Sequence, residues 1–402
     1  MKKIIVYFTG TFLNFFSLWI MSVLCVKILD YNAAGILSLG MSVGGIFVVI
    51  SNYGMRSFQT SDIYYEYSDS VYFVSRILTS VIGLLLCFLF SLLMPYNAPQ
   101  VMGINAFMLF KTVEALYDVI HGSMQRYGKT IFVGISLAVK GFINIIAFSG
   151  GLLLTKNLNW ALLFCTMTGI ILFYFFDWRS FRDINTFVYD KGTLGEVCSL
   201  LRKCTIMLAF SLTSPVLIAV PRIFLERYYG NDLLGIYASI ASPTIVISTF
   251  AQCILLPIIG ETASAYQKKD KKAVLCLLLV PALAILFSGI VALLVGELFG
   301  SELLAVLYTD KVKPYCDILK YVILSVVLTS FIMCFNNFFI AIRELKKLLL
   351  ISLTGCIIIF ALSFFFVKKY NIYGISHVMI ITQLIQLILM VFISFRIICK
   401  IK

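Results

Sequence analysis

An otherwise apolar part of the chain carries four ionisable side chains whose spacing could support chemistry. Lys111, Glu114 and Asp118 follow one another at intervals of three and four residues, so a helix over residues 98–120 would place them on one face. Lys140 lies at a similar depth in the next apolar segment. Ionisable groups inside a membrane span are costly and usually mark a substrate or ion pathway. One interpretation is a polar patch that contacts a bound molecule; the other is a neutral salt-bridge network in which Lys140 pairs with Glu114 or Asp118.

Arg222 is the single residue that we favour as an anion contact. It follows Pro221 directly, with Pro215 nearby, and proline removes a backbone donor, so we expect a broken helix here. Arginine can hold a phosphate group through two parallel hydrogen bonds. The alternative is an arginine at the outer interface that extends towards water or pairs with Glu226.

The composition explains which elements must position these residues. Hydrophobic residues make up 61% of the chain and charged residues 13%, whereas a soluble domain averages roughly 25% charged residues. Segments of about 20 apolar residues match a hydrocarbon core of about 30 Å. We therefore predict an all-α polytopic membrane protein with about twelve transmembrane helices, over residues 4–26, 35–56, 71–94, 98–120, 131–154, 158–177, 204–225, 233–258, 274–296, 314–338, 348–367 and 374–396.

A polar, basic stretch divides the chain into two halves. We predict an N-terminal six-helix bundle over residues 1–177, a cytoplasmic linker over 178–203 and a second six-helix bundle over 204–402. Lys and Arg are far more frequent in the loops on the side of this linker, which places both termini in the cytoplasm. Arg56 and Arg76 fall on that side. Arg56 could receive an anion that enters from the inner leaflet, or it could be an anchor that follows the positive-inside rule.

Two pairs of short similar segments, here called sequence echoes, suggest that the second half of the chain is a duplicate of the first. GILSLGMS begins at Gly35 and GIYASIAS at Gly235, and the loops QRYGKTIFVGIS and IRELKKLLLISL match Arg126 with Arg343. Two copies that insert the same way up would be related by an axis along the membrane normal. A pair of bundles with a seam between them is typical of transporters.

Several functional classes lack their sequence signals. Neither GxxxxGK[ST] nor GxGxxG occurs in the chain, so we expect no bound nucleotide. The eleven Cys and two His residues show no metal-ligand spacing, and we recognise no Ser-His-Asp set. The net charge of +13 is explained by cytoplasmic loops rather than by nucleic-acid binding. We therefore predict no cofactor, no metal and no nucleic-acid partner.

Three motifs resemble the Wzx-type flippases, the bacterial polysaccharide-export members of the MOP superfamily. They are YNAAGILSLGMSVGGI, NYGMRSFQTSD and QRYGK, and the six-plus-six layout extends the resemblance over nearly the whole chain. The resemblance implies a MATE/MOP-like fold with alternating access in the bacterial cell membrane. It also implies an undecaprenyl-diphosphate-linked oligosaccharide as cargo, which moves from the inner to the outer leaflet for capsule, O-antigen or exopolysaccharide synthesis. Its partners would be the phospholipid bilayer, a polysaccharide polymerase and other proteins of the pathway.

Two other functions stay open. A cation-coupled multidrug exporter of the MATE type would use Glu114 and Asp118 as its ion-coupling site. Many such exporters carry an acidic residue in the first helix, and residues 4–26 contain none. A membrane-embedded polymerase or ligase would need a sizeable outer loop with catalytic residues, whereas the predicted outer loops are short. We therefore expect a transporter rather than an enzyme.

Overall fold

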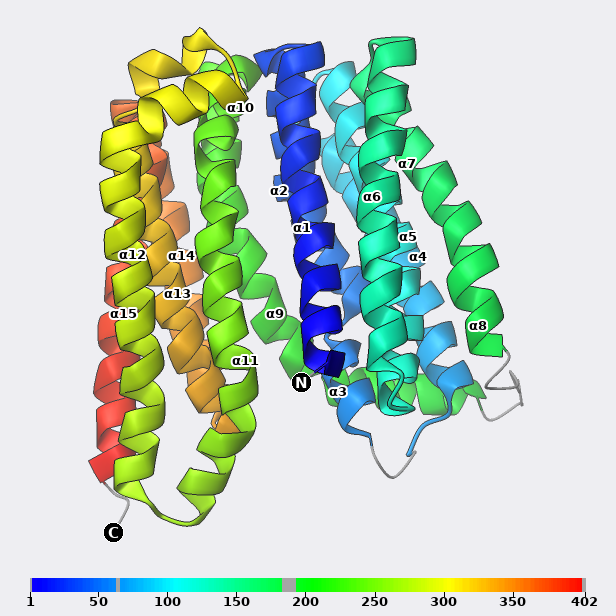
Figure 1. Ribbon diagram of the computed structural model, residues 1–402, viewed down its shortest axis with the longest axis vertical. Coiled ribbons are helices and arrows are strands. Elements are labelled where there is room, and N and C mark those ends of the chain that lie inside the picture. Colours follow the sequence, from blue (N-terminus) through cyan, green and yellow to red (C-terminus); the bar gives the residue numbers. More distant parts are fainter. Residues whose placement is uncertain (1, 63–65, 183–192, 400–402) are drawn as a thin grey trace. The chain divides into compact units, whose positions relative to one another are not determined.

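The computed structural model describes residues 2–62, 66–182 and 193–399, and all regular structure in these ranges is helical (Figure 1). Eleven helices of this described part are long and apolar enough to cross a membrane. A further long helix, α5 (Ala98–Arg126), has 29 residues but a more polar sequence because it carries the charged positions identified above. The predicted all-α polytopic membrane fold is thereby confirmed.

The chain forms two compact units, Met1–Pro215 and Val216–Lys402. The first unit contains α1 (Lys2–Ile28), α2 (Tyr31–Asn52), α3 (Met55–Ser61), α4 (Asp69–Leu93), α5, α6 (Thr130–Thr155), α7 (Leu158–Leu172), the π-helix η1 (Phe173–Trp178), α8 (Arg179–Arg182) and the first part of α9 (Thr193–Tyr229). The second unit contains the rest of α9, α10 (Asn231–Ala241), η2 (Ser242–Thr244), α11 (Ile245–Gln267), α12 (Lys271–Leu307), η3 (Asp310–Tyr315), α13 (Ile318–Ala341), α14 (Leu345–Tyr370) and α15 (Ile372–Cys399).

Helix α9 differs from its prediction in where it begins and in being continuous through two prolines. Residues 193–203, which we predicted to be linker, form its first turns. They are helical because Val197 and Leu200 are buried in an apolar cluster of the first unit. The expected break at the two prolines is also wrong, since α9 continues without interruption to Tyr229. Residues 183–192 of the predicted linker lie outside the described part of the chain.

Helix α5 is the central element of the first unit, because α2, α3, α4 and α7 all pack against it. Its start is fixed by a capping box, in which the side chains of Asn97 and Gln100 each accept from the other's backbone N–H. Its end lies at Arg126, beyond the predicted boundary at 120, and the chain turns at Gly128 in the left-handed region (φ 74°). The extra turns bring Gln125 and Arg126 onto the same helix as Lys111.

The turns after α5 and α13 correct one of the two sequence echoes. Gly128 and Arg343 occupy equivalent positions, with φ of 74° and 61°, and each donates its N–H to the carbonyl three residues earlier. Arg343 therefore corresponds to Gly128 and not to Arg126. The other echo agrees with the structure, since α2 and α10 begin at Tyr31 and Asn231, each four residues before the matched glycine.

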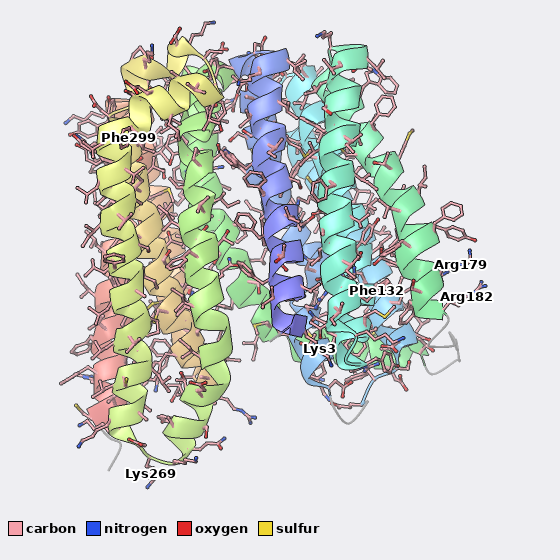
Figure 2. The ribbon with its side chains drawn as sticks, in the orientation of Figure 1. Lys3, Phe132, Arg179, Arg182, Lys269 and Phe299 are labelled. Atoms are coloured by element: carbon pink, nitrogen blue, oxygen red, sulfur yellow. The ribbon has the colours of Figure 1, made fainter. Side chains whose placement is uncertain are left out.

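Basic side chains gather at one end of the first unit. Figure 2 shows Lys3 at the start of α1 on the same side as Arg179 and Arg182 of α8. Lys269 lies at the turn between α11 and α12 in the second unit. Clusters of this kind are typical of cytoplasmic helix ends.

Helices α1 and α6 approach each other through glycines. A Cβ atom added at Gly134 would lie 2.5 Å from the carbonyl oxygen of Val6, and one added at Gly10 would lie 1.9 Å from that of Gly134. Small residues permit such close backbone contact between membrane helices. This contact fixes the position of α6, which carries Lys140.

We expect Gly134→Ala to lower the free energy of unfolding by about 2 kcal/mol or more, because two backbones must move apart. Thermal unfolding of the purified protein in detergent measures this loss. Gly150→Ala is the matched control, because it lies on the same helix and its added Cβ would meet nothing within 4 Å. Equal unfolding temperatures for the two variants would contradict the proposed contact.

Candidate functional site

Lys111, Glu114 and Lys140 form one cluster, here called the lysine triad. The Lys111 ammonium lies 2.5 Å from Glu114 Oε2, and the Lys140 ammonium lies 3.1 Å from Glu114 Oε1. The second contact is an ion pair without hydrogen-bond geometry. All three side chains are largely buried, with exposed fractions of 15%, 17% and 6%. The sequence therefore predicted correctly that Lys140 meets the charged face of α5.

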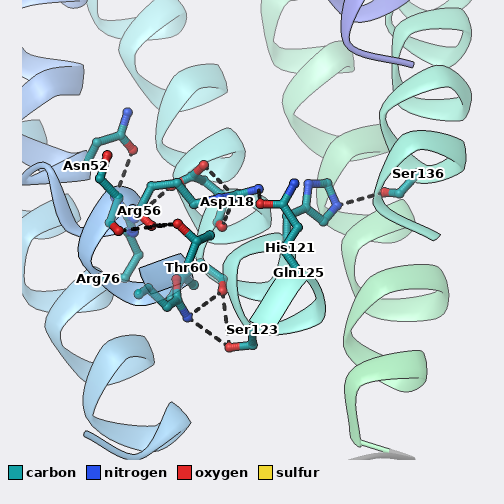
Figure 3. A network of polar contacts seen from close by, with 12 residues as sticks. Asn52, Arg56, Thr60, Arg76, Asp118, His121, Ser123, Gln125 and Ser136 are labelled. Carbon is teal, nitrogen blue, oxygen red and sulfur yellow. Dashed lines mark hydrogen bonds and ion pairs between the residues drawn. The ribbon is translucent and has the colours of Figure 1, made fainter. Parts of the chain in front are cut away.

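Arg56, Arg76 and Asp118 form a second cluster, the arginine triad (Figure 3). Each arginine lies 2.8 Å from a different oxygen of Asp118. Arg56 also donates to Gln125 Oε1 at 3.0 Å, and Arg76 donates to Asn52 Oδ1 at 2.9 Å. Arg76 is fully buried, although the sequence counted it with the basic residues of the cytoplasmic side.

These contacts correct the predicted neutral network. Asp118 pairs with two arginines and not with Lys140. Each triad contains two cations and one carboxylate, so each carries one surplus positive charge when all groups are ionised. A surplus charge inside an apolar bundle is costly, and an anion with several oxygen acceptors would balance it.

Arg222 lies on the part of α9 that belongs to the second unit. Its guanidinium carbon is 5.8 Å from the centre of the Tyr237 ring. Its Nε is buried and has no hydrogen-bond partner in the described part of the chain, where none of the ion pairs involves Arg222. The predicted alternative of a pair with Glu226 is therefore wrong. A partly buried guanidinium whose Nε has no acceptor is suited to bind an anion.

Arg126 forms a buried cluster that we did not predict. It contacts Asp62 at 3.3 Å and Asp69 at 2.5 Å, and the three side chains are at most 4% exposed. Tyr127 donates to Asp69 at 2.6 Å, and burial together with this bond raises the pKa of Tyr127 to about 12. The cluster ties the segment between α3 and α4 to the end of α5.

The Arg126 cluster explains why two of the family-like motifs occur together. NYGMRSFQTSD supplies Arg56, Gln59 and Asp62, whereas QRYGK supplies Gln125 and Arg126. Arg56 contacts Gln125, and Arg126 contacts Asp62. The co-occurrence of opposite charges in the two motifs was the signal that could have revealed this contact.

His121 belongs to a fourth group, which is buried and extends the polar face of α5 towards its end. Its Nε2 lies 3.0 Å from Ser136 Oγ on α6 and 2.8 Å from Asp177 Oδ1 on η1. Figure 3 shows His121 and Ser136 on facing helices, next to the arginine triad. The sequence placed Asp177 at the start of the polar stretch and gave no signal for this partner.

No metal-binding arrangement of His, Cys, Asp and Glu occurs among the residues that the structure describes. The carboxylates of the two triads, Glu114 and Asp118, instead form ion pairs with Lys and Arg side chains. The site can therefore bind an anion through cationic donors. It offers two clusters of cationic side chains on α5 and the helices that pack against it, all within the first unit.

The sequence and the fold of this chain are similar to those of several known proteins. No protein-family profile matches the chain. The capsular polysaccharide biosynthesis protein CapF of Staphylococcus aureus is 26% identical over 292 residues, which cover 70% of this chain and 71% of CapF. The lipid II flippase MurJ in an inward closed conformation aligns with a TM-score of 0.76 at 12% identity, over 99% of this chain and 90% of MurJ.

Two further solved structures agree. A MOP superfamily transporter from Pyrococcus furiosus aligns with a TM-score of 0.66 at 14% identity, over 99% of this chain and 95% of that protein. An inward-facing multidrug resistance transporter of the MATE family aligns with a TM-score of 0.66 at 15% identity, over 98% and 95%. The chain therefore has the fold of the MOP superfamily of transporters, as the resemblance in its sequence predicted.

Proposed function

We propose that this protein is a flippase that moves a lipid-linked oligosaccharide with an anionic diphosphate from the inner to the outer leaflet of the bacterial cell membrane. The observation that carries the proposal is the surplus positive charge of the lysine and arginine triads inside an apolar bundle. The similarity to CapF supports a repeat unit of a surface polysaccharide as the cargo. The similarity in fold to a lipid II flippase supports a lipid-linked substrate.

The residues differ in how free they are to bind the diphosphate. Arg222 has unused donors, and the ammonium groups of Lys111 and Lys140 share one carboxylate. We propose Lys111 and Lys140 as phosphate contacts of the first unit and, as a separate proposal, Arg222 as an anion contact of the second unit. Arg56 already donates to Asp118 and Gln125, so we propose that it orients the site and contacts the cargo only secondarily. Alternating access and a polymerase partner are parts of the proposal that rest on the family resemblance, whereas the cytoplasmic termini rest on the excess of Lys and Arg in the loops on that side.

The decisive experiment is conditional depletion of the protein in its native bacterium, followed by extraction of polyprenyl-linked sugars. Complete repeat units should accumulate while surface polymer is lost, and their mass would identify the sugar. Re-expression of the unaltered protein should reverse both changes. An intact surface with unchanged levels of lipid-linked units would overturn the flippase proposal.

Arg222→Ala should reduce surface polymer by about tenfold or more, because one charge-assisted contact with phosphate contributes about 1.5–3 kcal/mol. Complementation of the depleted strain, with polymer quantified at equal protein level, measures the effect. Arg222→Lys keeps the charge but loses the two-pronged geometry, so we expect partial activity. Arg227→Ala changes an exposed arginine of the same helix and is the control. Normal polymer in the Arg222→Ala strain would remove this residue from the site.

A cation-coupled drug exporter is the second candidate, favoured by the structural similarity to multidrug resistance transporters of the MATE family. It would use Glu114 and Asp118 to bind the coupling ion or a cationic drug. Each of these carboxylates already contacts two cationic side chains, which disfavours a further cation. Overexpression should then leave resistance to a panel of cationic drugs unchanged. A rise in resistance that Glu114→Gln abolishes would favour the exporter.

A further inference from the structure

The group formed by His121, Ser136 and Asp177 is a buried titratable cluster that cargo binding does not require. The three residues are exposed by 2%, 0% and 0%. Ser136 Oγ donates to Asp177 Oδ1 at 2.7 Å, and His121 Nε2 lies within hydrogen-bond distance of both oxygens. Three different elements, α5, α6 and η1, supply the members.

The composition resembles a hydrolase triad, but the geometry does not. In a catalytic triad the two ring nitrogens of histidine face opposite partners, one the serine and the other the carboxylate. Here the same Nε2 faces Ser136 and Asp177, so the ring cannot relay a proton between them. Because Ser136 donates to Asp177, the hydrogen on Nε2 must also point towards these oxygens.

One atom of the cluster is left without a partner. Asp177 Oδ2 is buried and accepts no hydrogen bond from the described part of the chain. A buried carboxylate oxygen without a donor is costly, and the cost falls when the group shares a proton or faces a cation. A protonated His121 ring supplies such a cation to the same carboxylate, with its Nε2 2.8 Å from Oδ1.

The charges around the ring are mixed. His121 interacts electrostatically with Arg56 from α3 and Lys140 from α6, besides Asp177 from η1. On its own helix it interacts with Asp118, one turn away and 31% exposed, and its ring lies 5.9 Å from that of Tyr117. Burial favours the neutral ring, and the cationic neighbours also oppose a second positive charge, whereas the carboxylates favour the protonated ring.

The backbone at Asp177 is unusual. Residues Phe173–Trp178 form a π-helix that joins α7 to α8. The wider turn places Asp177 inside the bundle, whereas Tyr174 and Phe175 are exposed. π-helical turns are rare and often occur at functional sites.

We infer that His121, Asp177 and Ser136 form a proton-binding site between α5, α6 and η1. The bound proton comes from water and is held as an imidazolium–carboxylate pair with no net charge. Its release leaves a neutral imidazole beside a carboxylate, so the pair gains one negative charge. Since the arginine triad adjoins His121, this change alters the balance of charge on the face of α5. The link to transport rests on the proposed flippase function, whereas the binding of the proton does not.

The chain offers a direct test because it contains two histidines. Replacing His377 by Asn leaves His121 as the only ring that 15N-histidine labelling detects. Solid-state NMR of this protein in lipid bilayers, between about pH 5 and pH 9, should show conversion between neutral and protonated imidazole. A ring that keeps one protonation state over the whole range would overturn the site.

Asp177→Asn in the same background removes the charge that balances the imidazolium. At a given pH the ratio of protonated to neutral ring should fall by about tenfold or more. Glu114→Gln removes another carboxylate of α5 that makes no contact with His121, and it should change this ratio far less. If Asp177→Asn does not fold, Ser136→Ala keeps both titratable groups and should still titrate. Equal ratios in the Asn variant and its parent would show that Asp177 is not the partner.

A second measurement tests the link to transport. Translocation of lipid-linked repeat units by purified protein in vesicles should depend on pH, and His121→Asn should abolish that dependence. A pH profile that is the same in the variant would overturn the coupling. If the unaltered protein moves no repeat units at any pH, the flippase proposal fails, and the NMR titration still decides the proton site.

Discussion

Arg126→Ala should destabilise the fold strongly, by about 3–5 kcal/mol, because removing one partner of a buried ion pair leaves the other charge uncompensated. Two carboxylates depend on this guanidinium. Asp62 and Asp69 are only 4% and 2% exposed, and they also accept hydrogen bonds from the neutral hydroxyls of Tyr72 and Tyr127 respectively. Thermal unfolding in detergent and the amount of protein in the membrane measure the loss.

Two variants show whether charge is the cause. Lys203→Ala breaks an ion pair with Glu66 in which both side chains are about half exposed, so we expect a far smaller loss of stability than for Arg126→Ala. Adding Asp62→Asn and Asp69→Asn to Arg126→Ala removes the uncompensated charges and should restore part of the stability. If the single Ala variant unfolds at the temperature of the unaltered protein, the cluster does not stabilise the fold.

The sequence predicted the features that depend on local pattern. Apolar segments of membrane length identified the helices, and the spacing of Lys111, Glu114 and Asp118 identified one polar face. Lys140 was matched to that face because consecutive helices joined by a short turn are neighbours. The MOP-like fold that the resemblance implied was confirmed by the similarity to solved structures, and the chain is also similar to a capsular polysaccharide biosynthesis protein.

The contacts that the sequence did not reveal join residues far apart in the chain. Arg76 and Asp118 are separated by 42 positions, and His121 and Asp177 by 56. The sequence counted Arg76 with the basic residues of the cytoplasmic side because it lies near the start of the predicted helix over residues 71–94. Its position inside the bundle follows from packing between α4 and α5, which no local pattern contains. Packing also explains the first turns of α9. Their polar sequence predicted a linker, but Val197 and Leu200 are buried in the apolar cluster of the first unit.

Neutralising the lysine triad as a whole should reduce export of repeat units by about a hundredfold or more. The change is Lys111→Gln, Glu114→Gln and Lys140→Gln together, which removes the surplus charge and leaves no group uncompensated. The expected loss corresponds to two charge-assisted contacts of about 1.5–3 kcal/mol each. Surface polymer and accumulated lipid-linked units in the complemented depletion strain measure it. The Lys111→Arg, Lys140→Arg variant preserves both charges and should retain most of the activity.

Glu114→Gln alone separates an anionic cargo from a cationic one. Its loss leaves Lys111 and Lys140 without their shared carboxylate, so the local charge rises by one unit. A diphosphate should then bind at least as tightly, and export should continue or slow only at release. If Glu114 instead binds a coupling cation or a cationic drug, the same substitution removes the ligand itself and transport should stop. Export that survives Glu114→Gln but not neutralisation of the whole triad would therefore assign the lysines to an anionic cargo, and the opposite pattern would assign the carboxylate to a cation.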